Sequence, residues 1–174
     1  QETDGSLLLD IPENLEVLKT RIVEPYGLFK WLSGKKQDDR LGVALISEKN
    51  KPGWFGRFSL WIRSNLFIPD PRMLWIRPSL RFLRKYLQSN PVKVVITTGP
   101  PHSMHLIGLG LKRKPGLKWV ADFRDPWTNI DFFQDLSLTM PARRCHHKLE
   151  QKILRGSDHI ITVSPGMTKD FKAM

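Results

Sequence analysis

Three short polar segments contain the residue types that could do chemistry. They are residues 97–103 (TTGPPHS), 121–127 (ADFRDPW) and 163–166 (VSPG). A histidine such as His102 can act as an acid, a base or a hydrogen-bond donor near neutral pH. A carboxylate such as Asp125 can hold a hydroxyl group or stabilise a developing positive charge. These segments are therefore the candidate site.

The TTGPPHS segment has two interpretations. In the functional one, Gly99 lets the backbone approach a ligand, and the helix that starts after Pro101 offers free N–H groups to an anion. Ser103 then lies at the start of that helix, and His102 reaches into a cleft. In the structural one, the prolines form a rigid turn and His102 caps the helix. The residues leave both open.

The ADFRDPW segment is the most informative of the three. Asp122 and Asp125 flank Arg124, and buried charges need partners. We expect one carboxylate to pair with Arg124 and the other to stay free for a substrate. Asp125, next to the proline turn, is predicted to be the exposed one. The alternative is an internal ion-pair network that holds the loop, with Trp127 filling the core.

Two other groups of polar residues are interpreted as structural. Ser164 is predicted to cap the helix after it, with a substrate contact as the alternative. Residues 145–147 (CHH), with His102 and His105, lack the spacing of a metal site. No metal is predicted, and these histidines are expected to be solvated on their helices.

The elements that position these segments alternate between strand and helix from residue 91 onward. This pattern predicts an α/β fold with a doubly wound, mostly parallel sheet, in which ligands bind outside the carboxyl ends of the strands. We therefore expect the three segments to lie along one edge. The predicted strands are 92–97, 117–121 and 159–163, and the predicted helices are 103–111, 141–155 and one starting at Pro165.

The helix at 141–155 has the strongest pattern. Pro141 suits its first turn and Gly156 is a natural stop. Cys145, Leu149 and Ile153 recur every four residues and predict its apolar face.

Residues 1–90 are less regular. Residues 15–23 and 41–46 are possible strands, and 59–67 is predicted to be helical. Asp70 is predicted to cap a further helix, which Pro78 kinks or restarts. The apolar stripe of this helix is Leu80, Leu83 and Leu87. The chain is thus interpreted as one domain, 1–174, with an irregular part (1–90) and regular βα units (91–174). A glycine-rich opening strand–helix unit is missing, which suggests a truncated fragment.

Composition restricts the class of protein. The net charge is +11 and the isoelectric point is about 10, so an anionic partner is expected. Cys145 is the single cysteine, which excludes an internal disulfide and fits a reducing compartment, most simply the cytoplasm. No segment has the roughly 20 apolar residues of a membrane-spanning helix.

Residues 57–85 combine seven basic side chains with one acid, Asp70, and several aromatic rings. Basic and aromatic residues together suit a membrane interface or single-stranded nucleic acid. An ordinary pair of amphipathic helices would look the same. No nucleic-acid motif accompanies the charge, so nucleic acid is not predicted as a partner.

Residues 67–174 resemble the N-terminal domain of group 1 glycosyltransferases, the retaining family 4 type with the GT-B architecture. The resemblance covers over half the chain, in matching order and spacing. It is carried by IPDPRMLW (68–75), VITTGPPHSMHLIGLGLK (95–112), WVADFRDPWT (119–128) and LEQKILRGSDHIITVSPGM (149–167).

The resemblance implies an acceptor-side domain of an enzyme that transfers a sugar with retention to a glycan or lipid-linked acceptor. The nucleotide-sugar donor would bind a C-terminal domain beyond Met174, so this domain needs no cofactor and is expected to be inactive alone. Asp125 would orient or deprotonate the acceptor hydroxyl, and His102 would hydrogen-bond the acceptor or sugar. The other implied substrate-binding residues are Gly99, Pro101, Ser103, Asp122, Arg124, Trp127 and Ser164.

Such enzymes commonly dock on the inner leaflet of the cell membrane. The resemblance therefore implies a cytoplasmic, peripheral protein whose basic aromatic stretch contacts anionic lipid. The predicted membrane or acceptor patch is Trp61, Arg63, Arg72, Trp75 and Arg77. The alternative function is a non-catalytic basic α/β module that binds anionic surfaces.

Overall fold

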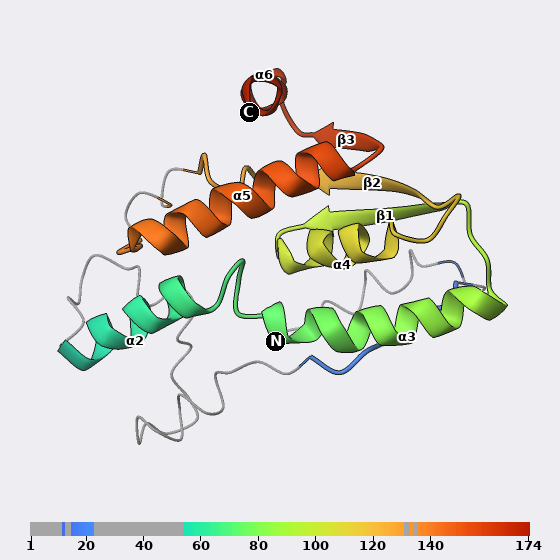
Figure 1. Ribbon diagram of the computed structural model, residues 1–174, viewed down its shortest axis with the longest axis horizontal. Coiled ribbons are helices and arrows are strands. Elements are labelled where there is room, and N and C mark those ends of the chain that lie inside the picture. Colours follow the sequence, from blue (N-terminus) through green and yellow to red (C-terminus); the bar gives the residue numbers. More distant parts are fainter. Residues whose placement is uncertain (1–11, 13–14, 23–53, 131–132, 134–135) are drawn as a thin grey trace.

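A computed structural model describes residues 12, 15–22, 54–130, 133 and 136–174. Its centre is a three-stranded parallel sheet in the order β1 (Val94–Gly99), β2 (Lys118–Phe123) and β3 (His159–Thr162) (Figure 1). Ala121 pairs with Thr97 on one side and with Ile160 on the other. The α/β class and the parallel pairing predicted from the alternating pattern are confirmed.

Each strand is followed by a helix. These are α4 (Ser103–Leu111), α5 (Met140–Gly156) and α6 (Pro165–Ala173). Their bounds follow the predicted ones closely because proline and cap residues mark the starts: Thr139 caps α5 and Ser164 caps α6 through their side-chain oxygens. Gly156 is the last residue of α5.

The chain before the sheet contains α2 (Trp54–Leu66), a short 3-10 helix η2 (Met73–Trp75) and α3 (Ile76–Ser89). Pro78 lies in the first turn of α3, so the helix restarts there after η2 and does not kink. The predicted stripe is the packed face of α3: Leu87 is buried, and Leu80 and Leu83 contact the same cluster.

Two predictions about this first part are wrong, and a third lies outside the described residues. Residues 15–22 have no regular structure; instead Thr20 accepts a hydrogen bond from the Trp75 indole (2.7 Å) and Glu16 one from the Tyr86 hydroxyl (2.5 Å). Asp70 caps no helix that follows it directly. The strand predicted at 41–46 lies outside the described part of the chain.

The main core lies between the sheet and the helices. The side chains of Trp119, Ala121 and Phe123 on β2 are fully buried and pack against Ile153 of α5 and Phe171 of α6. A second cluster joins α3 to α4 and comprises Leu87, Ile107, Leu111 and Leu117. These two clusters hold the carboxyl ends of the strands in place.

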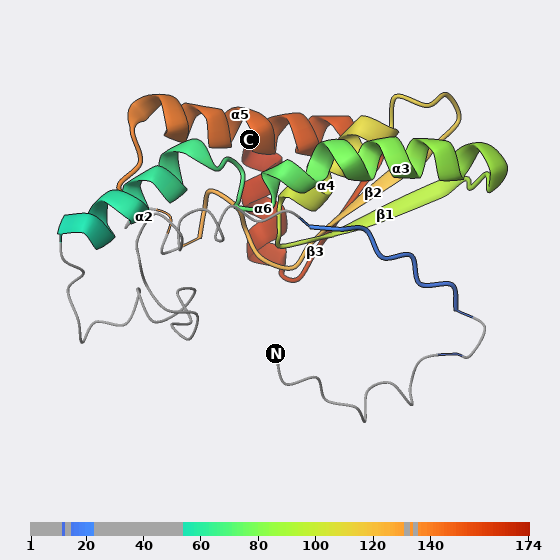
Figure 2. The same cartoon turned by 90° about the horizontal axis from the view of Figure 1, so that it is seen from below.

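The opposite face of the sheet is exposed. Ile96, Val94 and Ile161 are 63%, 49% and 44% exposed, whereas Figure 2 shows α3, α4 and α5 on the other side of the sheet. Parallel sheets are normally covered on both faces. In the described residues the structure is therefore an α/β fold with a three-stranded parallel sheet, compatible with a Rossmann-like fold, and the doubly wound arrangement stays a prediction.

The buried face of α5 matches the predicted one only in part: Ile153 is fully buried and Leu149 packs against the core, as predicted. Cys145 is exposed, and the buried residues are Ala142, His146, Glu150 and Ile153. The prediction followed apolar residues alone. Here a histidine and a glutamate take the buried positions because both find hydrogen-bond partners in the loop after β2.

Candidate functional site

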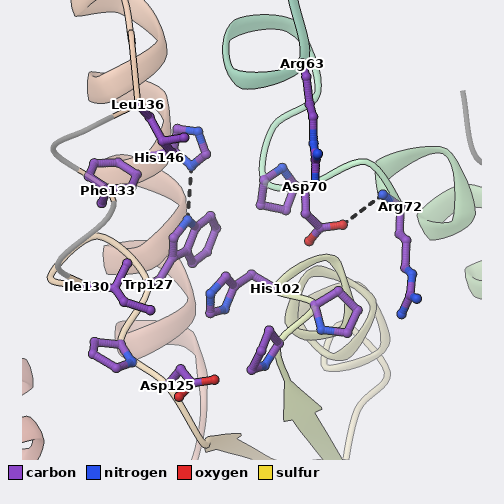
Figure 3. Close-up of a pocket in the computed structure, with 14 residues that line it drawn as sticks. Arg63, Asp70, Arg72, His102, Asp125, Trp127, Ile130, Phe133, Leu136 and His146 are labelled. Carbon is purple, nitrogen blue, oxygen red and sulfur yellow. Dashed lines mark hydrogen bonds between the residues drawn. The ribbon is translucent and has the colours of Figure 1, made fainter. Parts of the chain in front are cut away.

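A pocket of about 530 Å³ lies beyond the carboxyl ends of β1 and β2 (Figure 3). The loop after β1 supplies His102, and the loop after β2 supplies Asp125 and Trp127. Arg63 comes from α2 and His146 from α5. The remaining lining residues are Pro69, Asp70, Arg72, Pro100, Pro101, Pro126, Ile130, Phe133 and Leu136. Six of the predicted site residues thus share this pocket: Pro101, His102, Asp125 and Trp127, together with Arg63 and Arg72 of the predicted membrane or acceptor patch.

His102 is held as a neutral imidazole. Its ring stacks on Trp127 with centroids 4.7 Å apart and planes 4° from parallel. Burial, and next the nearby His105, lower the pKa of His102 to about 3 from an ordinary value of 6.5. Its Nδ1 is buried and has no hydrogen-bond partner. A neutral ring of this kind suits contact with a hydroxyl group more than with a carboxylate.

Trp127 links the loop after β2 to α5. Its indole N–H donates to Nδ1 of His146 (3.0 Å), so the proton of that neutral ring lies on Nε2. Burial lowers the pKa of His146 to about 4, partly opposed by a hydrogen bond with the backbone of Ser64. Trp127 therefore packs in the core, as the structural interpretation predicts, and also lines the pocket.

Asp125 is exposed, as predicted, and lies at the edge of the pocket below His102 (Figure 3). The predicted pairing of Arg124 with one of the two carboxylates is wrong. Arg124 is exposed, and the ion pairs within the described residues join Asp158 to lysines. The backbone N–H of Arg124 donates to the carbonyl oxygen of Gly99 (3.0 Å).

Glu150 holds the loop instead, and sequence reasoning missed it. Its side chain is fully buried on α5 and accepts hydrogen bonds from the backbone N–H (3.3 Å) and the hydroxyl of Thr128. The four-residue step from His146 to Glu150 places both on one face of the helix, next to Ala142 and Ile153. This four-residue spacing was the sequence signal that could have indicated a buried His146 and Glu150. The apolar pattern of Cys145, Leu149 and Ile153 pointed instead to a partly different face of the helix.

The start of α4 is not an anion site. Asp70 accepts the backbone N–H of Ser103 through Oδ2 (2.7 Å) and that of Arg72 through Oδ1 (2.9 Å). A carboxylate of the chain itself thus occupies the helix N-terminus, where a ligand anion was expected. His102 occupies the N-cap position of α4, as the structural interpretation predicts, but its side chain makes no capping hydrogen bond.

Gly99 and Ser103 serve packing. A Cβ atom on Gly99 would lie 2.5 Å from Nε2 of His105, so the missing side chain makes room for that ring and not for a ligand. Ser103 is fully buried, and its hydroxyl oxygen is without a hydrogen-bond partner. Neither residue lines the pocket.

Three other predicted substrate residues lie outside the pocket. Asp122 is half-buried on β2, and Arg124 is exposed in the loop that follows. Ser164 accepts the backbone N–H of Met167 (3.2 Å), which is the capping role predicted for it.

The five residues of the predicted membrane patch are divided between different environments. Arg63 and Arg72 line the pocket beside Asp70. Trp75 donates to Thr20 and packs between α3 and α4. Trp61 and Arg77 are exposed.

Of the histidines expected to be solvated, His147 is exposed, whereas His105 and His146 are buried. His105 is fully buried and bonds Thr97 (2.9 Å), and His146 is 5% exposed; burial lowers the pKa of each to about 4. Across the described residues, no group of three or more His, Cys, Asp or Glu side chains is placed to hold a metal ion.

Comparisons of the chain with protein-family models, with curated proteins and with solved structures gave no significant match. Within the described ranges, none of the helices combines the length and the apolar character that crossing a membrane requires.

Proposed function

We propose that the chain is the acceptor-side domain of a retaining glycosyltransferase with the GT-B architecture. A nucleotide-sugar donor would then be held by a second, C-terminal domain of the same protein. The observation that carries the proposal is the shared pocket of Asp125 and neutral His102 at the carboxyl ends of two adjacent parallel strands. This is where α/β folds bind ligands. The three-stranded parallel sheet is compatible with the Rossmann-like domains of this architecture.

In this proposal the acceptor hydroxyl attacks the anomeric carbon of the donor sugar, and the bond from that carbon to the nucleotide phosphate breaks. The transition state resembles an oxocarbenium ion. Asp125, exposed at the pocket edge, orients the hydroxyl and accepts its proton. His102 hydrogen-bonds the acceptor or the sugar without adding charge, because burial keeps its pKa at about 3.

Asp125→Ala tests this proposal in the complete protein with its donor domain. We expect the rate of sugar transfer to fall by about 100-fold or more, the range for loss of an acid–base group. Circular dichroism and thermal unfolding should be unchanged because the side chain is exposed. Asp125→Asn keeps the shape and removes the charge, so it separates orientation from proton transfer. Near-normal turnover of Asp125→Ala would exclude the role of Asp125.

The 174-residue chain on its own is expected to transfer no sugar. Incubation with labelled nucleotide sugars and a panel of glycan and lipid-linked acceptors measures this directly. Robust transfer by the chain alone would contradict the proposed need for a donor domain.

A second candidate function is binding to the anionic inner face of the membrane. Phe58, Trp61 and Phe82 are 54%, 40% and 40% exposed on α2 and α3, and Arg77 and Arg81 are exposed nearby in the sequence. Aromatic rings and basic groups together favour such an interface. Liposome flotation tests this: equal recovery with neutral and anionic vesicles, insensitive to salt, would count against it.

A further inference from the structure

Two arginines that the sequence associates with a membrane line the same pocket as His102 and Asp125. Arg63 enters from α2, and Arg72 enters from the turn before η2. Both are half-buried, and the prolines and aromatic rings around the pocket make its walls largely apolar. A guanidinium beside apolar walls attracts an anion more strongly than one in open solvent.

The charges of the pocket are separated in space. Figure 3 shows Asp70 between Arg63 and Arg72, and Asp125 on the far side of His102. The two oxygens of Asp70 each accept a backbone N–H, from Arg72 and from Ser103. His102 and His146 are neutral near pH 7 because burial lowers their pKa values to about 3 and about 4. The two arginines outnumber the single carboxylate of Asp70, so one end of the pocket is net cationic, and the other end is anionic through Asp125.

We infer that the pocket takes a polyol or sugar that carries a phosphate monoester, with the phosphate at Arg63 and Arg72 and a free hydroxyl at Asp125 and His102. This deepens the proposed function and relies on it for the role of the hydroxyl. A phosphate monoester carries a charge of about −1.5 to −2 at pH 7, whereas a carboxylate ligand carries a single negative charge. Two guanidinium groups therefore match a phosphate better than they match a carboxylate. Repulsion from Asp125 sets the orientation. Both arginines have other contacts, and each guanidinium has five N–H donors to share.

Nuclear magnetic resonance titration of the 174-residue chain tests the inference with glucose 6-phosphate and with glucose. The indole N–H of Trp127 reports on the pocket, and Trp127→Phe identifies its signal. We expect saturable shifts with glucose 6-phosphate and at least about tenfold weaker binding of glucose, which is the discrimination that one charged contact gives. Equal affinity for the two sugars would overturn the inference.

Arginine variants show whether glucose 6-phosphate binds through the pocket or through the overall positive charge of the chain. Arg63→Gln and Arg72→Gln should each weaken glucose 6-phosphate binding by about tenfold or more. Arg144→Gln is the matched control: it removes the same charge from an exposed position on α5 outside the pocket lining. Its affinity should equal that of the unaltered chain. A loss with Arg144→Gln as large as that with Arg63→Gln would overturn the inference in favour of nonspecific attraction.

Vesicles distinguish a soluble phosphate from a lipid head group. If Arg63→Gln lowers recovery with phosphatidylglycerol vesicles while glucose 6-phosphate leaves the Trp127 signal unmoved, the arginines serve a membrane and the inference is overturned. If inorganic phosphate displaces bound glucose 6-phosphate and reverses the shift of the Trp127 signal, the phosphate site is supported.

The failure of this inference and that of the proposed function have different signatures. Normal turnover of Asp125→Ala in the complete protein removes the catalytic proposal, while phosphate discrimination through Arg63 and Arg72 still supports a phosphate site. Loss of turnover in Asp125→Ala with equal affinity for glucose and glucose 6-phosphate overturns the phosphate site alone.

Discussion

The close approach of Gly99 to the ring of His105 leaves no room for a side chain at residue 99, where a Cβ would lie 2.5 Å from Nε2. We expect Gly99→Ala to lower the free energy of unfolding by about 1–3 kcal/mol, as overpacking in a core does. Gly166→Ala is the control, since its Cβ would meet nothing nearer than 3.9 Å. Urea unfolding of both variants measures the difference. Equal stability would show that the His105 ring moves aside without cost.

The second contact at the residue scale is the buried pair of Glu150 and Thr128. Glu150→Ala leaves the backbone N–H and hydroxyl of Thr128 without their acceptor in a buried site. We expect the free energy of unfolding to fall by about 1–3 kcal/mol, the cost of unsatisfied buried groups. The resonance of the Trp127 indole should shift, because Thr128 is its neighbour. Lys152→Ala, exposed on the same helix, should change neither quantity; an equal effect of the two variants would mean that Glu150 does not hold the loop.

At the scale of the elements, the cap of α6 decides what Ser164 does. Its hydroxyl oxygen accepts the N–H of Met167, so Ser164→Ala should lower the free energy of unfolding by about 1 kcal/mol. Ser164→Asp should restore most of it because aspartate also caps helices. Urea unfolding gives both values. Acceptor affinity should be unaffected in the complete protein; a Ser164→Ala variant that keeps its stability and loses acceptor binding would assign the serine to the substrate.

The starts of the helices are the part of the fold that short sequence signals predict well. Pro141 and Pro165 lie in the first turns of α5 and α6, and the one strand between these helices, β3, is rich in apolar residues. These signals act within a few residues of chain, so they need no knowledge of distant partners. The packed face of α5 was predicted only in part, for the opposite reason. Leu149 and Ile153 pack as expected, but His146 and Glu150 take buried positions because Trp127 and Thr128 reach them.

For the whole molecule, three neutral buried histidines predict sensitivity to acid. Burial lowers the pKa values of His102, His105 and His146 from 6.5 to about 3, about 4 and about 4. Between pH 6.5 and about pH 4 the unfolded chain therefore binds more protons than the folded one. The free energy of unfolding should fall as the pH falls through this window and level off above it.

Urea titrations at closely spaced pH values across this window measure the effect. His102→Gln removes one titrating group and should make the dependence on pH shallower. Asp158 acts in a separate, more acidic window, because the hydrogen bond from Lys112, and next that from the Trp119 backbone, lower its pKa below the ordinary 3.8. The stability that Asp158 contributes is present above pH 3.8 and is lost as the pH falls toward the lowered pKa. A stability that stays constant from pH 6.5 to about pH 4 would contradict the buried neutral histidines.

The sequence by itself determined the α/β class, the order of strands and helices from β1 to α6, and the exposure of Asp125. These follow from local periodicity, from proline and cap residues, and from the rule that parallel strands end at one edge. The sequence also drew attention to His102 and Trp127, although it left their roles open between ligand contact and packing.

Only the tertiary structure decided which polar groups are partners. Asp70 caps α4, Thr128 bonds Glu150, Trp127 bonds His146, and Arg63 and Arg72 line the pocket. The hydrogen-bonded partners are about 20 to 33 residues apart along the chain. A buried polar group must be paired, but its type does not say with what. That choice depends on which side chains the packed helices and strands bring within reach.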